Sequence, residues 1–301
     1  MKNKFILIFL TISILSFEAS LGKEILQTGS KSNFKNTANS FLVNHDSITV
    51  ISYNIRYDSP NDGKNKWEFR KNGLAKMLKN LNPEIIGIQE GLKHQIDFLQ
   101  KKLQNFDVVG IDRDNNFKGE YSSIFFNKLT FKLISTETFW LSQSPKTTSK
   151  GWDASYPRIC TYVILEHKIS QEKIYVFNTH LDHIGATSRI EGSKLIIQKI
   201  KEITPKNAKT ILMGDFNDNE NSETISYIKS YLVDGKNKSL KNINTQKGTY
   251  NGFNVNSDLK YRLDYIFSKN LRFKTYVHVK KTLQNTLWPS DHLPVLASFE
   301  M

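Results

Sequence analysis

Polar side chains that bind metals or orient water follow several apolar segments of this sequence. In "ILMGDFNDN", residues 211–219, an apolar run ends at Gly214 and is followed by Asp215 and Asn217. Gly, Asn and Asp also build ordinary turns, so this segment alone is ambiguous. Comparable side chains follow four other apolar segments: Asn54, Glu90, His180, and Asp264 with Asp291 and His292. Because the pattern recurs, we expect one site to which all five segments contribute.

The types of side chain indicate metal-assisted hydrolysis of a phosphate ester. Carboxylate and amide oxygens are ligands that suit Mg²⁺ or Mn²⁺. A histidine with an adjacent aspartate suits general acid–base work, because the carboxylate selects the tautomer and stabilises the imidazolium. A bound metal would neutralise charge that develops on phosphorus while a base activates water. With one Cys and seven His in the chain, a closed structural zinc site is not expected.

Hydrophobic periodicity predicts the elements that would position these side chains. Alternating or wholly apolar runs predict strands, and apolar residues at helical spacing predict helices between some of them. Strands outnumber helices, and several are apolar on both faces, which favours two sheets packed face to face with helices outside. The expected strands are 47–55, 84–90, 121–128, 131–141, 159–168, 173–182, 209–217, 263–269 and 293–300, and the expected helices are 73–82, 94–103, 188–203 and 223–232.

The first 22 residues resemble an export signal. Lys2 and Lys4 precede an almost wholly apolar stretch at residues 5–15, and small residues follow where a peptidase would cut. The apolar stretch is too short to cross a bilayer, so we expect no stable membrane insertion. The segment predicts an exported protein, either periplasmic or secreted.

The rest of the chain divides into an arm and one domain. Residues 23–45 are polar and predict a poorly ordered arm, and residues 46–301 predict a single domain. The lone Cys160 cannot form an internal disulfide, so the domain must rest on its apolar core. The formal net charge is +13. Such a charge attracts polyanions, although a compositional bias toward Lys gives the same value.

Six segments together resemble the endonuclease/exonuclease/phosphatase superfamily. "SYNIRYD", "IIGIQEG", "NTHLDH", "MGDFND", "YRLDYIF" and "SDHLPV" follow one another from Ser52 to Val295 in the superfamily's order. This superfamily includes deoxyribonuclease I, abasic-site endonucleases, deadenylases and neutral sphingomyelinases. The block from Phe139 to Tyr162 is similar to an exported bacterial branch. The resemblance implies an α/β four-layer sandwich, in which two mostly antiparallel sheets pack face to face with helices outside and the site lies at one rim.

The resemblance also implies roles for the metal and acid–base residues. Glu90 resembles the principal Mg²⁺ ligand, with Asn54 and Asp291 close to the metal and phosphate. His292 resembles the acid–base histidine, which Asp264 would orient.

Further roles implied by the resemblance concern water and phosphate. Asp215 and Asn217 would position the attacking water and the transition-state oxygens. His180 matches the second histidine of the deoxyribonuclease and deadenylase branches, and Glu120 resembles the carboxylate that pairs with it in deoxyribonuclease I. Tyr121 resembles instead a phosphate-contacting tyrosine of the abasic-site branch, or it is an aromatic residue packed on a strand.

Two arginines are candidates for substrate binding. Arg56 follows Asn54 where abasic-site enzymes carry an aspartate, and this makes the first motif more similar to deoxyribonuclease I, whose arginine there contacts nucleic acid. Arg158 could clamp a phosphate through its bidentate guanidinium. The tryptophans Trp67, Trp140 and Trp152 could stack on a base or sugar, or pack within loops.

The sequence therefore predicts an exported, monomeric Mg²⁺-dependent phosphoesterase, with Mn²⁺ as the other possible metal. Nucleic acid is the first expected substrate, cleaved at its phosphodiester bonds. A sphingomyelinase-like phospholipid phosphodiesterase or a small-molecule phosphatase is the alternative. A polyanion-binding module without turnover is a third hypothesis, which intact metal and acid–base residues disfavour.

Overall fold

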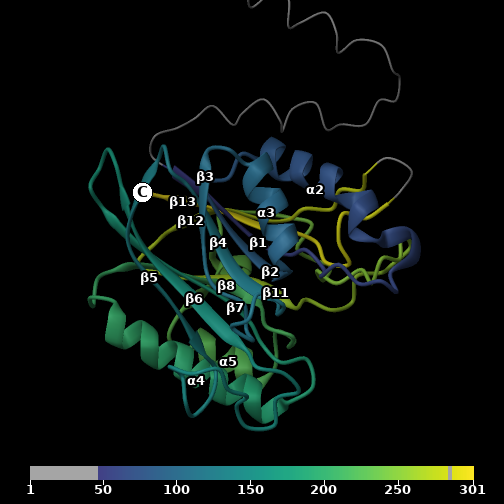
Figure 1. Ribbon diagram of the computed structural model, residues 1–301. Coiled ribbons are helices and arrows are strands. Elements are labelled where there is room, and N and C mark those ends of the chain that lie inside the picture. Colours follow the sequence, from purple (N-terminus) through teal and green to yellow (C-terminus); the bar gives the residue numbers. More distant parts are fainter. Residues whose placement is uncertain (1–46, 284–286) are drawn as a thin grey trace, which may run out of the picture. The chain divides into compact units, whose positions relative to one another are not determined.

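Two β-sheets pack face to face in the computed structural model, which describes residues 47–283 and 287–301 (Figure 1). The expected export signal and arm lie outside the described residues. In sheet order, the seven-stranded sheet consists of β10 (Lys241–Ile243), β12 (Phe273–His278), β13 (Val295–Glu300), β1 (Ser47–Asn54), β2 (Ile85–Gly91), β4 (Tyr121–Asn127) and β3 (Phe106–Val109).

The second sheet has six strands, and most neighbours in both sheets are antiparallel. Parallel pairs are β1 with β2, β10 with β12, and β7 with β8. In sheet order, the six strands are β5 (Phe131–Trp140), β6 (Ile159–His167), β7 (Lys173–His180), β8 (Lys209–Asp215), β11 (Asp264–Lys269) and β9 (Val233–Asp234).

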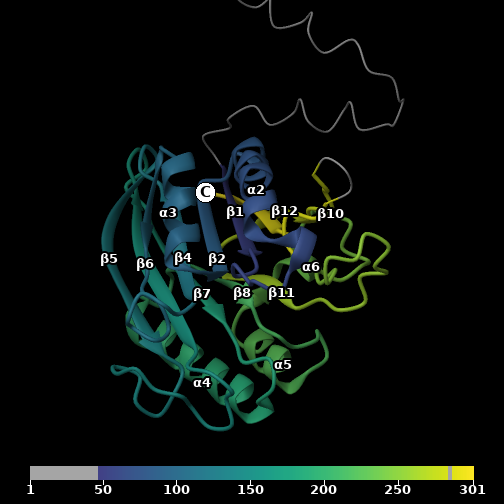
Figure 2. The same ribbon diagram turned by 45° about the vertical axis from the view of Figure 1, so that its right-hand side comes forward.

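Helices cover the outer face of each sheet, which completes four layers (Figures 1 and 2). The helices α2 (Trp67–Leu81) and α3 (Lys93–Lys102) pack on the seven-stranded sheet. On the six-stranded sheet lie α4 (Ala186–Ile203) and α5 (Glu223–Lys229). Short helical turns η1 (Gly63–Asn65) and α6 (Gly235–Lys238) occur in connections. The predicted fold class is confirmed.

Strands with two apolar faces join the layers. Along β1, Val50 packs between the sheets and Ile51 packs toward α2 and α3. Along β8, Ile211 and Met213 lie between the sheets, whereas Leu212 faces α4 and α5. Because side chains alternate across a strand, a strand buried on both faces needs a nearly continuous apolar run. This explains why such runs, rather than strict alternation, mark the central strands.

The expected elements recur with shifted ends, and the short ones were missed. The first predicted helix begins at Trp67 rather than at residue 73, and the last, α5, ends at Lys229 rather than at residue 232. The sequence analysis did not predict β3, β9, β10 or β12. In β12 the register shifts between Phe273 and Thr275, so its apolar residues do not alternate regularly.

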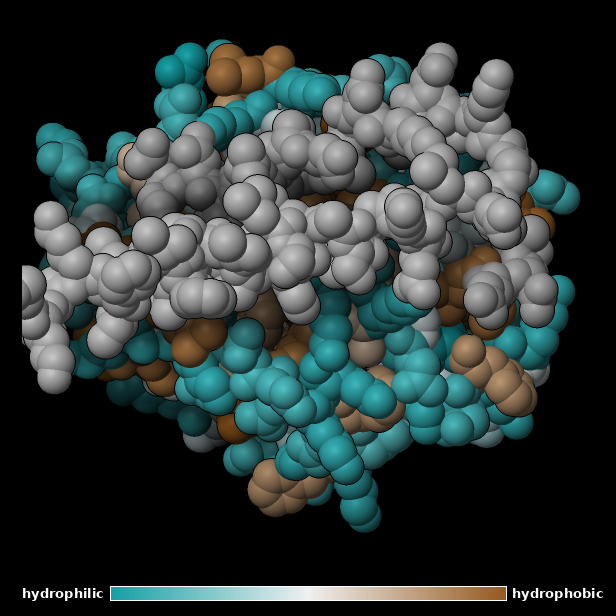
Figure 3. Space-filling model, turned by 90° about the horizontal axis from the view of Figure 1, so that it is seen from above, coloured by the Kyte–Doolittle hydropathy of each residue, from teal (hydrophilic) through white to brown (hydrophobic). Residues whose placement is uncertain are grey.

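The described surface is mixed in polarity. Where it is visible in Figure 3, hydrophobic residues occur among hydrophilic ones. Within residues 47–283 and 287–301, no helix has the length and apolar character needed to cross a bilayer.

Candidate active site

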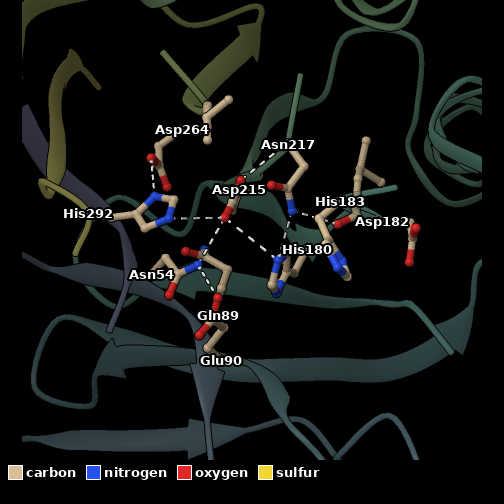
Figure 4. A network of polar contacts seen from close by, with 12 residues as sticks. Asn54, Gln89, Glu90, His180, Asp182, His183, Asp215, Asn217, Asp264 and His292 are labelled. Atoms are coloured by element: carbon tan, nitrogen blue, oxygen red, sulfur yellow. Dashed lines mark hydrogen bonds and ion pairs between the residues drawn. The ribbon is translucent and has the colours of Figure 1, made fainter. Parts of the chain in front are cut away.

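Asp215 lies at the centre of a polar network at the end of β8 (Figure 4). Its Oδ2 atom accepts a hydrogen bond of 2.9 Å from Asn54 Nδ2. The same oxygen lies 3.6 Å from His180 Nε2 and 3.7 Å from His292 Nε2. Asp215 is 1% exposed, so these contacts form in a water-poor environment. One carboxylate therefore joins residues from three other segments of the chain.

Sheet register explains this convergence. Asp215 is the direct partner of His180 in the β7–β8 pair and of Asp264 in the β8–β11 pair. Gly214 allows β8 to approach β7, because a Cβ atom on Gly214 would lie 2.1 Å from the carbonyl oxygen of Thr179. The adjacency of the three polar residues is thus a consequence of strand pairing.

The His292 side of the network is held by a buried carboxylate. His292 Nδ1 lies 2.8 Å from Asp264 Oδ2, which also accepts a 2.6 Å hydrogen bond from Thr249 Oγ1. His292 and Asp264 are 5% and 0% exposed. Burial alone would lower the pKa of His292, but Asp264 and Asp215 raise it well above its usual value. The geometry assigns a proton to Nδ1 and directs Nε2 toward Asp215.

The His180 side of the network has different chemistry. Asn217 Nδ2 lies 3.1 Å from His180 Nε2 and donates to the carbonyl oxygen of Leu181 at 3.0 Å. An amide nitrogen can only donate, so Nε2 accepts and the imidazole carries its proton on Nδ1. Nδ1 lies 3.8 Å from Glu120 Oε2. Burial, followed by the charge of Arg158, lowers the pKa of His180 well below its usual value.

Glu90 enters the site through a bulge in β2. The register with β4 shifts between Ile88 and Gly91, and Glu90 has a φ of 62°. Bulges commonly redirect a side chain next to an active site. Glu90 Oε1 accepts a 2.9 Å hydrogen bond from Asn54 Nδ2, and Oε2 accepts one of 3.1 Å from the amide of Tyr57.

Three residues of the site have left-handed backbone conformations. Arg56, Glu90 and Asn217 have φ values of 56°, 62° and 48°. Left-handed conformations cost a non-glycine residue on the order of 1–2 kcal/mol. Their persistence at three residues around one carboxylate is typical of a functional site, where the surrounding structure holds strained residues in place.

Arg56 and Asp291 lie beside Glu90. Arg56 binds Asp62 through Nε and Nη2, at 3.1 and 3.0 Å. Its Nε is 3.9 Å from Asp291 Oδ2, and its Nη1 is 4.0 Å from Glu90 Oε2. Burial, opposed by the charge of His292, raises the pKa of Asp291. The structure therefore places Arg56 against site carboxylates.

The donor set fits a hard divalent cation. Ligand atoms of Glu90, His180 and Asp215 lie within 4.8 Å of one another, as do those of Asp215, Asp264 and His292. Burial, opposed by the charge of His292, raises the pKa of Asp215 to about 7, and Asp264 Oδ1 is buried without a hydrogen-bond partner among the described residues. Clustered buried carboxylates disfavour one another's charge, and a cation relieves this. Oxygen donors suit Mg²⁺ or Mn²⁺.

The remaining predicted residues lie next to His180 or in the core. Glu120 Oε2 accepts a 2.8 Å hydrogen bond from Arg113 Nη1. Arg158 binds Asp182 through Nε at 3.2 Å. Tyr121 is 6% exposed and packs in the apolar cluster under α2 and α3. Trp67 and Trp140 are 3% and 4% exposed, which supports packing rather than stacking on a ligand.

Several residues that hold the site were not predicted from the sequence. Arg70 is fully buried on α2, and it donates to the carbonyl oxygens of Ile55, Arg56 and Pro289. It therefore joins the loop after β1 to the segment before Asp291. The predicted helix began at residue 73, so the sequence pattern left Arg70 outside it and did not mark this arginine as helical or buried. The other missed residues are Arg113 and Thr249, which lie outside the quoted segments, and Asp182 and His183, which end the segment "NTHLDH" but were given no role.

Fold and site together define a class of protein. A family model, the Endonuclease/Exonuclease/phosphatase family, matches residues 51–292. The chain belongs to this family of metal-dependent phosphoric ester hydrolases.

Solved structures from Bacteroides resemble this chain over nearly their full lengths. A mannosyl-6-phosphatase of Bacteroides thetaiotaomicron is 33% identical, with a TM-score of 0.81, and the match covers 84% of this chain and 100% of that chain. A family member from Bacteroides vulgatus is 30% identical, with a TM-score of 0.80, and the match covers 85% of this chain and 99% of that chain. These neighbours are consistent with a bacterial branch.

A more distant relative acts on nucleic acid. The Ccr4 subunit of Candida albicans, a 3′-5′-exoribonuclease of the CCR4-Not complex, is 25% identical over 85% of this chain and 41% of its own length. The chain thus spans less than half of that relative.

Proposed function

We propose that this protein is an exported, monomeric, metal-dependent phosphatase whose substrate is the phosphate monoester of a small carbohydrate. The observation that carries the hydrolytic part is the convergence of Asn54, His180 and His292 on one oxygen of Asp215. The carbohydrate part is supported by the 33% identity to a mannosyl-6-phosphatase along that protein's entire chain. Among the alternatives set by the sequence, this favours the small-molecule phosphatase.

In the proposed reaction, the two sides of Asp215 do different work. Glu90, with Asn54 and Asp291 beside it, would hold Mg²⁺ or Mn²⁺, which neutralises charge on the phosphoryl oxygens. Asp215 orients the attacking water, and the backbone amide of Asn217 holds its carboxylate by donating to Oδ1 at 2.9 Å.

The two histidines serve the phosphoryl group and the leaving group. His292 transfers a proton through Nε2, while Asp264 holds its imidazolium. His180 is buried and carries its proton on Nδ1, so this N–H can donate to a phosphoryl oxygen and stabilise the charge that develops there. Arg158, which borders His180 and pairs with Asp182, adds to burial in lowering the pKa of His180 and so helps to keep the imidazole neutral.

Nucleic acid is the second candidate substrate. The net charge of +13 and the position of Arg56 beside Glu90 favour it, together with the exoribonuclease relative. A diester needs no different centre, because the same groups stabilise the attacked phosphorus.

A substrate panel separates these candidates. The full chain is incubated with mannose 6-phosphate, p-nitrophenyl phosphate, bis-p-nitrophenyl phosphate, single-stranded DNA, RNA and sphingomyelin, each in Mg²⁺, Mn²⁺ or EDTA. We expect the highest kcat/KM for the sugar phosphate and no turnover in EDTA. Preferred cleavage of DNA or RNA would contradict the carbohydrate assignment, and polyanion binding without turnover would contradict the enzyme.

Export needs its own test. Expressing the full gene with a C-terminal tag in a Gram-negative host should yield a mature protein outside the cytoplasm, and its N-terminal sequence should begin near residue 23. An intact Met1 in a cytoplasmic protein would contradict export.

A further inference from the structure

A narrow pocket borders His180 beside the proposed reaction centre. Its walls include Arg113, Glu120 and Arg158, and we call it the Arg113–Arg158 pocket. Its volume of about 10 Å³ admits about one water-sized group. Arg158 is 5% exposed, so the guanidinium there is largely shielded from solvent. The pocket suits one polar substituent of a substrate bound next to it, rather than a whole ring.

Both arginines have hydrogen-bonding capacity that the described residues do not use. Arg113 Nε and Arg158 Nη1 are buried and have no hydrogen-bond partner among the described residues. An unpaired buried donor is unfavourable and calls for an explanation such as a ligand. Glu120 accepts from Arg113 through Oε2, so its Oε1 remains able to accept from a ligand. The residues that line the pocket therefore carry unused donors and an acceptor.

The charges around the pocket balance in pairs. Arg113 Nη1 lies 2.8 Å from Glu120 Oε2, and Arg158 Nε lies 3.2 Å from Asp182 Oδ2. A second phosphate would meet no surplus of positive charge there. A hydroxyl group accepts from a guanidinium and donates to a carboxylate, so it matches both kinds of wall.

Aromatic contacts hold Arg113 in place. The Arg113 guanidinium carbon lies 4.7 Å from the ring centroid of Tyr156, and that ring stacks on His183 at 6.1 Å with an interplanar angle of 17°. His183 Nδ1 lies 3.0 Å from Arg158 Nη2, so the stack connects the two arginines. A guanidinium held on several sides loses little freedom when it binds a ligand.

From these contacts we infer that the Arg113–Arg158 pocket binds a hydroxyl group of the sugar that carries the phosphate. The inference rests on the proposed function and deepens it, because it assigns residues that distinguish sugar phosphates from other phosphate monoesters. Arg113 and Arg158 donate to the hydroxyl oxygen, and the hydroxyl donates to Glu120. Tyr156 acts as a positioning residue through Arg113.

The test compares two substrates in two matched variants. Arg113→Met removes the guanidinium and keeps most of the stem. Arg272→Met is the control, because Arg272 is an exposed arginine that pairs with Glu300 at 3.3 Å. For mannose 6-phosphate, Arg113→Met should raise KM about tenfold, the effect of losing one hydrogen bond to a charged group. For p-nitrophenyl phosphate, which has no sugar hydroxyl group, Arg113→Met should raise KM by a clearly smaller factor, and with Arg272→Met the KM of both substrates should stay within about twofold.

A binding measurement keeps this inference separate from turnover. Calorimetric titration of mannose 6-phosphate into the full-length His292→Asn variant, in Mg²⁺, gives a Kd, and adding Arg113→Met should raise that Kd about tenfold. If no phosphate ester is hydrolysed but this selective weakening occurs, the proposed function fails and the hydroxyl pocket stands.

Other results would overturn the pocket assignment. Equal losses for both substrates would mean that Arg113 is structural, and unchanged constants for both would mean that the pocket binds no hydroxyl. A loss confined to oligodeoxynucleotides would assign the pocket to nucleic acid. In each case hydrolysis of p-nitrophenyl phosphate by the unaltered protein would still support the hydrolase.

Discussion

Asp215 separates two buried histidines that the fold has made chemically different. On one side, His292 is paired with Asp264 through Nδ1, and its pKa is raised well above the usual value. On the other, His180 faces the amide of Asn217, and burial and nearby arginines lower its pKa. Burial disfavours charge at both positions, so the partner decides the outcome. One side of the site thus supplies a charged imidazole, and the other supplies a neutral one.

This difference assigns proton transfer to the His292 side. A charged imidazole with Nε2 toward Asp215 can give a proton, whereas a neutral one that already accepts from Asn217 can only donate through Nδ1. Replacing each histidine by an uncharged amide therefore has unequal consequences.

The largest effect is expected for His292→Asn. The variant keeps a donor near Asp264 but cannot carry a transferable proton, so kcat should fall by about 10²–10⁴-fold with little change in KM. Steady-state kinetics on the best substrate of the panel checks this, with circular dichroism to verify folding. A folded variant with normal kcat would remove His292 from the mechanism.

His180→Gln should cost less. Glutamine retains a donor and an acceptor but holds them at different positions from those of the imidazole. We therefore expect kcat to fall by about 10–100-fold. The same assay as for His292→Asn measures it. If the loss equals or exceeds that of His292→Asn, the two sides share proton transfer and the comparison fails.

Thr249→Val tests the support of the His292 side without touching a histidine. It removes the 2.6 Å hydrogen bond to Asp264 Oδ2, and the backbone amides of Leu263 and Asp264 lose their acceptor at Thr249 Oγ1. Urea unfolding should show a loss of about 1–3 kcal/mol, and kcat should fall by about tenfold because Asp264 is held less firmly. Unchanged stability and unchanged kcat would show that Asp264 needs no such support.

A third histidine shows what burial does without a catalytic partner. His278 is 0% exposed, and its Nδ1 donates to the carbonyl oxygen of Lys247 at 2.9 Å. Its Nε2 is buried and has no hydrogen-bond partner within residues 47–283 and 287–301. Burial lowers the pKa of His278 to about 4. The unfolded chain, with a histidine pKa of about 6.5, binds a proton that the folded chain does not. Between these values the folded state therefore loses stability as pH falls.

The smallest effect on activity is expected for His278→Asn, whose amide can keep the bond to Lys247. Activity should be unchanged, but the dependence of stability on pH should become flatter. From about pH 6.5 down to pH 4, the unaltered protein should lose up to about 1.4 kcal/mol per pH unit more than the variant. Urea unfolding at several pH values measures the two slopes. Parallel slopes would show that His278 is not the cause.

Strand ends made much of this site predictable from sequence. Glu90, His180, Asp215 and Asp264 each follow or begin an apolar run, and strand register then brings them together. A pattern along the chain could indicate that they share a rim. It could not indicate that Glu90 needs a bulge, because a bulge depends on the partner strand.

The supporting residues were not predictable in the same way. Thr249 reaches Asp264 across 15 positions, and Arg113 contacts Tyr156 across a longer separation. Both lie in connections where polar residues are common, so their types carry little information. The strand β12 was not predicted because its bulge breaks the alternation. Local pattern thus predicted the central strands and the principal site residues, while tertiary contacts determined their support.

The most direct test of the account is the turnover of mannose 6-phosphate by the full chain and by Glu90→Gln, each in Mg²⁺ and in EDTA. Both oxygens of Glu90 accept hydrogen bonds, from Asn54 and from the backbone amide of Tyr57, so glutamine preserves the shape, removes the charge and keeps one of the two bonds. We predict that EDTA abolishes turnover by the unaltered protein and that a folded Glu90→Gln variant loses at least about 100-fold in Mg²⁺. Undiminished turnover by Glu90→Gln, or by the unaltered protein in EDTA, would contradict a metal-assisted centre around Asp215.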